Sequence, residues 1–169
     1  LIKIKVYIVF KWNKSIKEFS YNLIINKIIF IKKSVYLKMI ENRPIKYSIL
    51  LPTYNKAKYL TFTIESVLSS KYKNFELIIS DDYSTDYTSK LLSQINDERV
   101  NIIKPPIKLT QTKNYEFLLK YARGEWITIL GDDDGILPNF FEKLDKYLNK
   151  FDDVEAIHTK PAFYYWDGV

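Results

Sequence analysis

Short apolar runs alternate with longer amphipathic stretches from Lys46 onward, and this alternation limits the possible folds more than any other feature of the chain. The apolar runs predict strands over residues 47–51, 76–80, 100–103, 126–130 and 154–159. Strands this apolar, separated by helices, are typical of a mostly parallel sheet with helices on both faces. The sequence therefore predicts an α/β fold of the order βαβαβαβαβ.

The stretches between the apolar runs predict four helices, and turn residues mark where they begin. We expect them over 57–70, from a cap at Thr85 or Asp86 to Gln94, over 111–122, and from Pro138 in a first turn to 149. Apolar positions recur at a spacing of three and four residues. The expected inward residues are Tyr59, Leu60, Thr63, Ile64, Val67 and Leu68 in the first helix, and Phe117, Leu118 and Tyr121 in the third.

Three polar clusters follow predicted strands directly. They are Pro-Thr-Tyr-Asn at 52–55, Asp-Asp-Tyr-Ser-Thr-Asp at 81–86 and Gly-Asp-Asp-Asp-Gly at 131–135. Ligands of such sheets collect at the carboxyl ends of the strands, near the point where the strand order reverses. We therefore expect one site built from all three clusters. With four glycines and neither a Gly-x-Gly-x-x-Gly nor a phosphate-binding P-loop motif, a dinucleotide fold and a P-loop enzyme are not supported.

The third cluster carries three adjacent carboxylates, Asp132, Asp133 and Asp134. Such carboxylates repel one another, and Mg²⁺ or Mn²⁺ bridging them to a diphosphate would remove that repulsion. The alternative interpretation is a solvated acidic turn in which one aspartate caps the next helix. The position directly after a predicted buried strand favours the metal site.

The other two clusters offer groups that suit a nucleotide. Asp81 and Asp82 could accept hydrogen bonds from a base or a ribose hydroxyl, or could form an Asx-turn that ends the strand. Pro52 is expected to end its strand and to fix a turn. Tyr54 can stack on a base, and Asn55 can form a hydrogen bond or cap the following helix.

The charge of the chain is unevenly distributed. Residues 1–38 hold nine lysines and one glutamate, a net charge of +8. Because the whole chain carries +6, the remaining residues carry −2. The longest apolar runs of this leader are far shorter than the roughly 20 residues of a membrane span, and it has no signal-peptide pattern. Since the domain itself is nearly neutral, a nucleic-acid role is not supported.

The only methionine, Met39, stands a few residues before the first predicted strand. We expect a domain over 39–169, preceded by a leader over 1–38 that is upstream of the true start and not native to the domain. The alternative is a basic amphipathic segment that associates peripherally with a membrane. The absence of cysteine excludes thiolate metal sites and disulfides and fits a cytoplasmic protein.

Several motifs together resemble the family 2 glycosyltransferases of GT-A fold, a Rossmann-like nucleotide-diphospho-sugar transferase fold. They are the segment 48–55, Glu-Ser-Val-Leu at 65–68, the segment 72–82 with Ser-Thr-Asp at 84–86, Gly-Glu-Trp-Ile at 124–127, and the segment 130–138. Their order and spacing agree with the family over residues 46–149. The resemblance implies an inverting enzyme that moves a sugar from a nucleotide diphosphate donor, commonly a UDP-sugar, to an acceptor hydroxyl with help from Mn²⁺ or Mg²⁺.

The resemblance also implies roles for individual residues. Pro52, Thr53 and Tyr54 match the first nucleotide contacts, and Asp82, together with Asp81, matches the carboxylate that reads uracil. Lys113 stands where the family usually has arginine, and a lysine cannot offer the planar fork of that side chain; the alternative is an exposed helical lysine. The family often has Asp-x-Asp-Asp where this chain begins with Gly131. Asp133 is the expected metal ligand, with Asp134 as a second candidate, and Asp132 or Asp134 is expected to contact the ribose or to support the loop.

The catalytic base of the family is an acidic residue beyond the donor-binding half, and none is recognisable before Val169. Asp152, Asp153 and Asp167 stand in no motif, and we expect His158 to be a packed strand residue. We therefore expect a donor-binding part that is incomplete at its C-terminus. The alternatives are a non-catalytic nucleotide-sugar binding fragment and a nucleotidyltransferase with two metals. By analogy the acceptor is a saccharide or lipid-linked oligosaccharide of the cell envelope, at the inner face of the membrane.

Overall fold

The computed structural model describes residues 2–3, 8–11, 45–151, 153–159 and 163–164. Its main feature is a six-stranded sheet with the order β5-β4-β3-β6-β2-β7. The strands of this sheet are β2 (Ile8–Lys11), β3 (Tyr47–Thr53), β4 (Phe75–Asp81), β5 (Val100–Ile103), β6 (Trp126–Ile129) and β7 (Ala156–His158). A separate antiparallel pair joins β1 (Ile2–Lys3) to β8 (Phe163–Tyr164). The predicted α/β fold is confirmed.

Parallel pairing forms the centre of the sheet. Strand β3 pairs in parallel with β4 over its whole length and with β6 from Tyr47↔Trp126 to Leu50↔Ile129. Every residue of β3 and β4 is buried, as expected for strands that are covered on both faces. Pro52 does not end its strand as predicted, because β3 continues to Thr53. The ladder to β6 has already ended at Leu50, so the missing N–H of Pro52 breaks no bond on that side.

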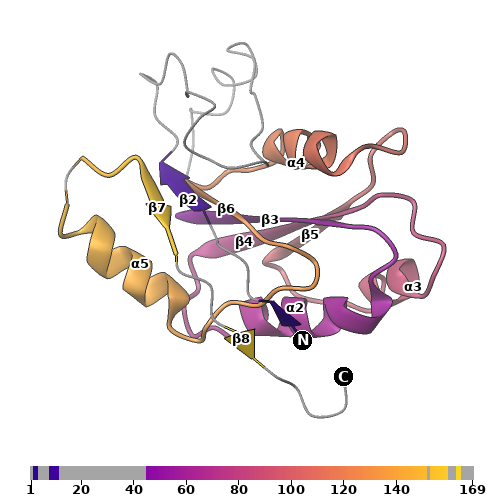
Figure 1. Cartoon of the computed structure of the whole chain (residues 1–169), viewed down its shortest axis with the longest axis horizontal. Coiled ribbons are helices and arrows are strands. Elements are labelled where there is room, and N and C mark those ends of the chain that lie inside the picture. The colour runs from indigo at the N-terminus through magenta and orange to yellow at the C-terminus, as the bar shows by residue number, and fades with distance from the viewer. Residues whose placement is uncertain (1, 4–7, 12–44, 152, 160–162, 165–169) are drawn as a thin grey trace.

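Within the described residues, four helices cover the two faces of the sheet (Figure 1). The helices α2 (Ala57–Leu68), α3 (Thr88–Leu92) and α5 (Phe140–Leu148) lie below the sheet in that view, and α4 (Gln111–Leu119) lies above it. All four are shorter than predicted at one end or both. Helix α5 begins at Phe140, so Pro138 precedes the helix and is not in its first turn. Helix α3 begins at Thr88, and its N-cap residue is Tyr87 rather than Thr85 or Asp86.

Alternate residues of the strands feed two separate cores. Odd-numbered residues of β3 and β4 pack with α2 and α5, where Phe141 stacks on Phe75 with ring centres 5.0 Å apart. Even-numbered residues such as Leu50 and Ile78 pack with α4. The inward face of α2 is confirmed at Leu60, Thr63, Ile64 and Val67, whereas Tyr59 and Leu68 are only half-buried.

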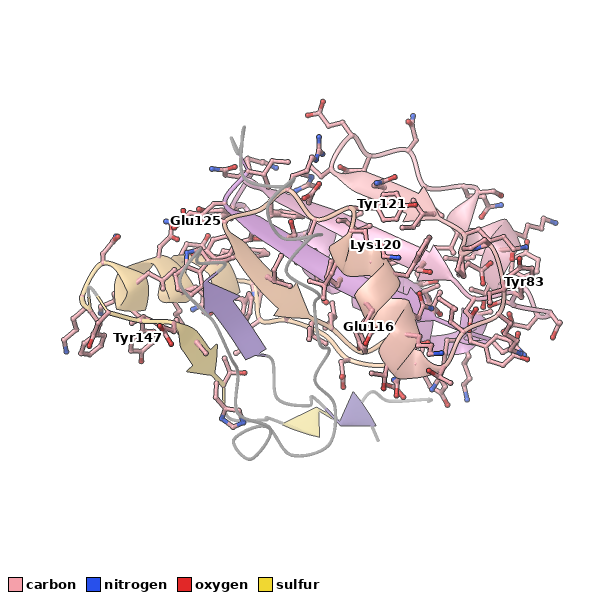
Figure 2. All side chains as sticks on the ribbon, turned by 90° about the horizontal axis from the view of Figure 1, so that it is seen from above. Tyr83, Glu116, Lys120, Tyr121, Glu125 and Tyr147 are labelled. Carbon is pink, nitrogen blue, oxygen red and sulfur yellow. The ribbon has the colours of Figure 1, made fainter. Side chains whose placement is uncertain are left out.

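The inward face of α4 is confirmed at Leu118 and differs from the prediction at Phe117 and Tyr121. The buried residues are Asn114, Tyr115, Leu118 and Leu119. Tyr121 lies beyond the end of the helix, is 42% exposed, and makes an edge contact with the ring of Phe117. Figure 2 shows Tyr121 with Glu116 and Lys120 on the outer side of this segment. The spacing of Phe117 and Tyr121 predicted that both rings face the sheet, but the two rings contact each other instead.

Part of the leader lies in the sheet. Strand β2 pairs antiparallel with β6 through Val9↔Thr128 and with β7 through Val9↔Ile157. It therefore separates two strands that run in the same direction. Residues 12–44, which include Met39, are outside the described part of the chain. Among the described residues, no helix is long and apolar enough to cross a membrane.

Candidate functional site

The strand order reverses at β3. The chain adds β4 and β5 on one side of β3 and then returns to place β6 on the other side. At such a switch point the loops after the two central strands diverge and leave room for a ligand. Here the backbone N–H of Tyr54, just after β3, donates to Oδ2 of Asp132, after β6, at 3.4 Å. The first and third polar clusters are thus brought together as predicted.

The turn after β3 is fixed to the second polar cluster through Asn55. This residue has φ of 52°, a left-handed conformation that asparagine tolerates better than most residues. Its Oδ1 accepts hydrogen bonds from the N–H of Thr85 at 2.7 Å and of Asp86 at 3.3 Å. Its own N–H donates to Oγ of Ser84 at 2.9 Å. Asn55 therefore binds two strand-end loops together and does not cap α2.

Asp86 stabilises the start of two helices. Its Oδ2 accepts from the N–H of Ala57, the first residue of α2, at 3.1 Å, and its Oδ1 accepts from the N–H of Thr88 at 2.9 Å. Hydrogen bonds from Thr88 and Ala57 lower the pKa of this carboxyl, because they favour its charged form. Asp86 is thus not the N-cap residue of α3, but its carboxylate accepts from the first N–H group of α3 and of α2, and the second contact was not predicted.

Asp81 and Asp82 are both buried, and their contacts differ. Asp81 Oδ1 accepts from the N–H of Ser84 at 3.0 Å, and Oδ2 accepts from the Ser89 hydroxyl. The bond to Ser84 reaches three residues along the chain, one more than in the Asx-turn that was the alternative interpretation of the cluster, and it likewise holds the turn after the strand. Asp82 Oδ1 accepts from the N–H of Leu109 at 2.9 Å, which fixes the loop between β5 and α4 to the end of β4. A contact of Asp82 with a nucleobase would use Oδ2.

Tyr54 is accessible at the switch point, with 41% of its surface exposed. The Nζ of Lys108, in the loop after β5, lies 3.6 Å from the centre of its ring. The same loop places the Nζ of Lys104 at 4.2 Å from the ring of Tyr83, whose hydroxyl donates to the carbonyl of Pro106 at 2.9 Å. Tyr83, with φ of 60°, is labelled in Figure 2 at the end of the sheet opposite Tyr147 and Glu125. Two ammonium groups thus face two aromatic rings at the edge where the three clusters meet.

The three carboxylates of the acidic turn have different surroundings. Burial raises the pKa of Asp132, against the opposing effects of the nearby Thr53 hydroxyl and Lys56 ammonium. Asp133 Oδ2 forms an ion pair with Nζ of Lys56 at 3.0 Å. Asp134 is only 4% exposed, and its Oδ2 occupies the place where a side chain on Gly131 would begin. A side chain at 131 would therefore force Asp134 to move.

Three observations bear on whether this turn suits a divalent cation. Its donors are carboxylate oxygens, which hard cations prefer. The Lys56 ammonium already stands as a cation at Asp133. Within the described part of the chain, the buried Thr53 hydroxyl has no hydrogen-bond partner of normal geometry. Within the described residues no three acidic, histidine or cysteine side chains converge into a metal cage. The turn fits Mg²⁺ or Mn²⁺ held by one or two carboxylates with phosphate oxygens completing the shell.

Lys113 lies exposed in the first turn of α4, and its N–H donates to Oγ1 of the N-cap residue Thr110 at 3.4 Å. Among the described residues, its side chain forms no hydrogen bond or ion pair with the three clusters, so its expected contact with the nucleotide stays a prediction. The neighbouring Asn114 is buried, and its Oδ1 has no hydrogen-bond partner within the described residues.

Sequence reasoning missed Lys56 and Lys108 as site residues. Lys56 is 77 positions from Asp133, and nothing local marks their pairing. Lys108 lies in a loop whose course depends on the hydrogen bond from Leu109 to Asp82. A charge adjacent to the Pro-Thr-Tyr-Asn cluster was the one available signal for Lys56.

The remaining acidic candidates and the histidine are distant in the chain from these clusters. Asp152 and Asp167 lie outside the described residues, and Asp153 is exposed in the loop before β7. His158 is in a strand as expected, paired with Ile8, but it is exposed rather than packed. None of them is identified as a catalytic base.

Comparison with known proteins shows which family this chain resembles. The model of the family described as "Glycosyl transferase family 2" matches residues 48–165. The chain is 34% identical over 109 residues to glycosyltransferase GlyG of Streptococcus pneumoniae serotype 4, which is 62% of this chain and 36% of GlyG. It is 39% identical over 87 residues to the Escherichia coli UDP-Glc:alpha-D-GlcNAc-diphosphoundecaprenol beta-1,3-glucosyltransferase WfaP, which is 52% of this chain and 35% of WfaP. Matches thus span little more than a third of these relatives.

Solved structures show the same fold. Staphylococcus aureus TarS, crystallised as residues 1–349 with UDP-GlcNAc, matches 63% of this chain and 32% of that protein, with a TM-score of 0.59 and 25% identity. The mannosyltransferase PcManGT of Pyrobaculum calidifontis, solved with GDP-Man and Mn²⁺, matches with a TM-score of 0.56 and 20% identity, over 63% of this chain and 33% of that protein. The chain belongs to glycosyl transferase family 2.

Proposed function

We propose that this chain is the donor-binding part of a metal-assisted glycosyltransferase that takes its sugar from a nucleotide diphosphate. The observation that carries the proposal is the bond from the Tyr54 N–H to Asp132, which joins the first polar cluster to the acidic turn across the switch point. An aromatic ring and a carboxylate turn at one sheet edge suit the two ends of such a donor, the base and the diphosphate. Family membership supports the same conclusion.

Each residue has a definite part in the proposal. The exposed ring of Tyr54 stacks on the base, and Pro52 and Thr53 shape the strand end beneath it. Asp82 reads the base through Oδ2, while Asp81 holds the turn that positions it. Asp132 lies beside the ribose, Asp133 with Asp134 behind it faces the diphosphate, and Lys113 on the first turn of α4 adds positive charge. A bound Mg²⁺ or Mn²⁺ would neutralise charge on the leaving diphosphate.

The donor that we propose first is a UDP-sugar. Relatives support this choice, because WfaP is named for UDP-Glc and TarS was solved with UDP-GlcNAc. The acceptor is a hydroxyl of a saccharide or a lipid-linked saccharide, as the diphosphoundecaprenol acceptor in the name of WfaP suggests. Reaction of that hydroxyl from the face opposite the leaving group inverts the anomeric carbon, and the base that takes its proton is not among the residues assigned above.

A cytoplasmic location at the inner face of a membrane is part of the proposal. A lipid-linked acceptor would be reached there, and the net charge of +8 on residues 1–38 would favour anionic lipid headgroups. A two-metal nucleotidyltransferase has less support, because no three acidic side chains converge among the described residues. Release of pyrophosphate from a nucleoside triphosphate would favour that function instead.

Calorimetric titration of UDP and GDP into the whole chain, with and without Mn²⁺, tests the donor site. We expect UDP to bind more tightly than GDP and to bind more tightly with Mn²⁺ than without it. Asp133→Asn should abolish the effect of Mn²⁺, and Asp82→Asn should reduce the preference for UDP. The matched control is Asp153→Asn, which removes the same charge from an exposed loop and should bind as the unchanged chain does.

Absence of UDP binding by the folded chain would contradict the proposal outright. Binding without detectable release of sugar from a panel of UDP-sugars, even with saccharide acceptors, would favour a non-catalytic nucleotide-sugar binding protein. Both outcomes are read from the same preparation, so folding is checked once by circular dichroism.

A further inference from the structure

Lys56 is placed so that its side chain must reach the acidic turn. It is the N-cap residue of α2, and its carbonyl accepts from the N–H groups of Tyr59 and Leu60, both at 2.9 Å. Its own N–H donates to Oγ1 of Thr88 at 3.1 Å. The backbone of Lys56 is thus held on both sides, and its side chain leaves a fixed point beside the end of β3.

The ammonium group of Lys56 acts as the counter-ion of the turn. It lies 3.0 Å from Oδ2 of Asp133, and the two side chains are 33% and 40% exposed. The charge of Asp132 is also close enough to contribute to the raised pKa of Lys56, although the hydrogen bond with Asp133 is the largest cause. The repulsion among the adjacent carboxylates is therefore already relieved by a charge that belongs to the chain.

A divalent cation bound at Asp133 would stand close to the Lys56 ammonium, and the two positive charges repel each other. We propose that Lys56 competes with the divalent cation for Asp133, so that metal binding moves the ammonium away from this carboxylate. This inference rests on the proposed function for the metal's role, and it assigns to Lys56 a regulatory part in that site. It predicts weak metal binding by the chain alone.

The same competition couples the metal to the donor. When the metal takes Asp133, the released ammonium remains tethered beside the turn, where a diphosphate would supply a new partner. Binding of the diphosphate therefore offsets the cost of displacing Lys56, and metal and nucleotide each strengthen the binding of the other by the same factor. Without Lys56 that mutual effect becomes smaller.

Titration of Mn²⁺ alone into the whole chain, followed by the paramagnetic resonance of the free ion, tests the competition directly. We expect Lys56→Met to bind Mn²⁺ roughly fivefold more tightly than the unchanged chain, a factor set by the modest free energy of a half-exposed ion pair. Lys56→Arg, which keeps the charge, should bind as the unchanged chain does. In addition, the ratio of Mn²⁺ affinities with and without UDP should fall in Lys56→Met.

Lys58→Met is the matched control, since it removes a lysine from the same helix. The Nζ of Lys58 lies 5.4 Å from the ring of Tyr59, and the change alters the net charge equally. Its Mn²⁺ affinity should stay near that of the unchanged chain. If Lys56→Met is poorly folded, the difference between Lys56→Arg and Lys56→Gln in the shift of melting temperature caused by Mn²⁺ gives the same comparison.

The outcomes separate this inference from the proposed function. Equal Mn²⁺ affinity in the unchanged chain, Lys56→Met and Lys58→Met overturns the competition and leaves the nucleotide site standing. Failure of UDP to bind contradicts the proposed function but does not alter a titration that contains no nucleotide. Failure of every variant to bind Mn²⁺ overturns the inference as well as the metal role of the turn.

Discussion

At the scale of single residues, the most demanding environment in the sheet is that of Glu76 on β4, which is 2% exposed. Its carboxylate accepts from the Ser48 hydroxyl at 2.6 Å and from the N–H of Arg123 at 2.7 Å. The Arg123 guanidinium adds a bond from Nε at 2.9 Å, although that side chain is 64% exposed. The buried carboxylate is thus bonded by two neutral donors and by the guanidinium, whose Nη2 also lies 2.9 Å from Oε2.

We predict that Glu76→Ala lowers the free energy of unfolding by roughly 3 kcal/mol, because it leaves buried donors without an acceptor. Arg123→Ala should cost about 1 kcal/mol, since only the exposed guanidinium is lost. Urea denaturation of both variants measures the difference. Equal losses would show that the ion pair, and not the set of neutral donors, stabilises Glu76.

Asp97 provides a residue whose effect depends on pH. The hydrogen bonds of Arg99 lower its pKa from 3.8 to about 2, with Nη2 and Oδ2 2.7 Å apart. Because the folded pKa is the lower one, this stabilisation is present above pH 3.8 and is lost as the pH falls through 2. When the pH falls from about 6 to about 2, the free energy of unfolding should decrease in both chains. We predict that it decreases by on the order of 2 kcal/mol less in Asp97→Asn than in the unchanged chain. Denaturation at several pH values tests this, and parallel pH profiles would contradict it.

At the scale of elements, the junction of α4 and β6 depends on a close approach at Gly124. A Cβ there would lie 2.5 Å from the backbone nitrogen of Ser48 and 2.8 Å from the carbonyl carbon of Tyr47. The N–H of Gly124 also donates to Oγ of Ser48 at 2.7 Å. The glycine therefore sets where β6 begins beside β3.

We predict that Gly124→Ala destabilises the chain by about 2 kcal/mol, since backbone atoms must move to admit the methyl group. Gly135→Ala is the control, because the nearest atom to its Cβ would be the Ser66 hydroxyl oxygen at 3.3 Å. Melting temperatures should fall clearly in the first variant and little in the second. Similar values in both would mean that the start of β6 adapts without cost.

Local sequence patterns predicted most of the helices and strands, but they did not predict contacts between segments that are distant in the chain. The segments 47–51 and 126–130 are mainly apolar, which indicated buried strands. The predicted ends of these central strands therefore lie within two residues of the observed ends. Strand β2 has only a short apolar run, and it pairs with residues more than a hundred positions away. Lys56 and Asp133 likewise form a pair that no local rule indicates, whereas the meeting of three strand-end clusters follows from parallel pairing.

At the scale of the whole molecule, the structure bears on where the domain begins. Strand β2 belongs to the leader that we expected to lie outside the domain, and yet its backbone bonds to both β6 and β7. We propose that residues 8–11 are a part of the folded unit. The division into a leader over 1–38 and a domain over 39–169 then serves only as a description of charge.

Replacing Val9 with proline tests that proposal, because proline removes an N–H from a strand that is paired on both sides. We predict that Val9→Pro lowers the free energy of unfolding by roughly 3 kcal/mol. Val9→Ala keeps the N–H and should cost less. Urea denaturation gives both values, and equal stability of Val9→Pro and the unchanged chain would place the leader outside the fold.

The central claim is that a metal and a nucleotide diphosphate meet at the switch point between β3 and β6. Anomalous diffraction at the manganese edge, from crystals of the whole chain grown with UDP and Mn²⁺, tests it most directly. The account predicts a manganese peak beside the Asp133 carboxylate, with UDP density on the ring of Tyr54 and the ammonium of Lys56 moved away from Asp133. A manganese peak elsewhere, or UDP bound away from Tyr54, would contradict it.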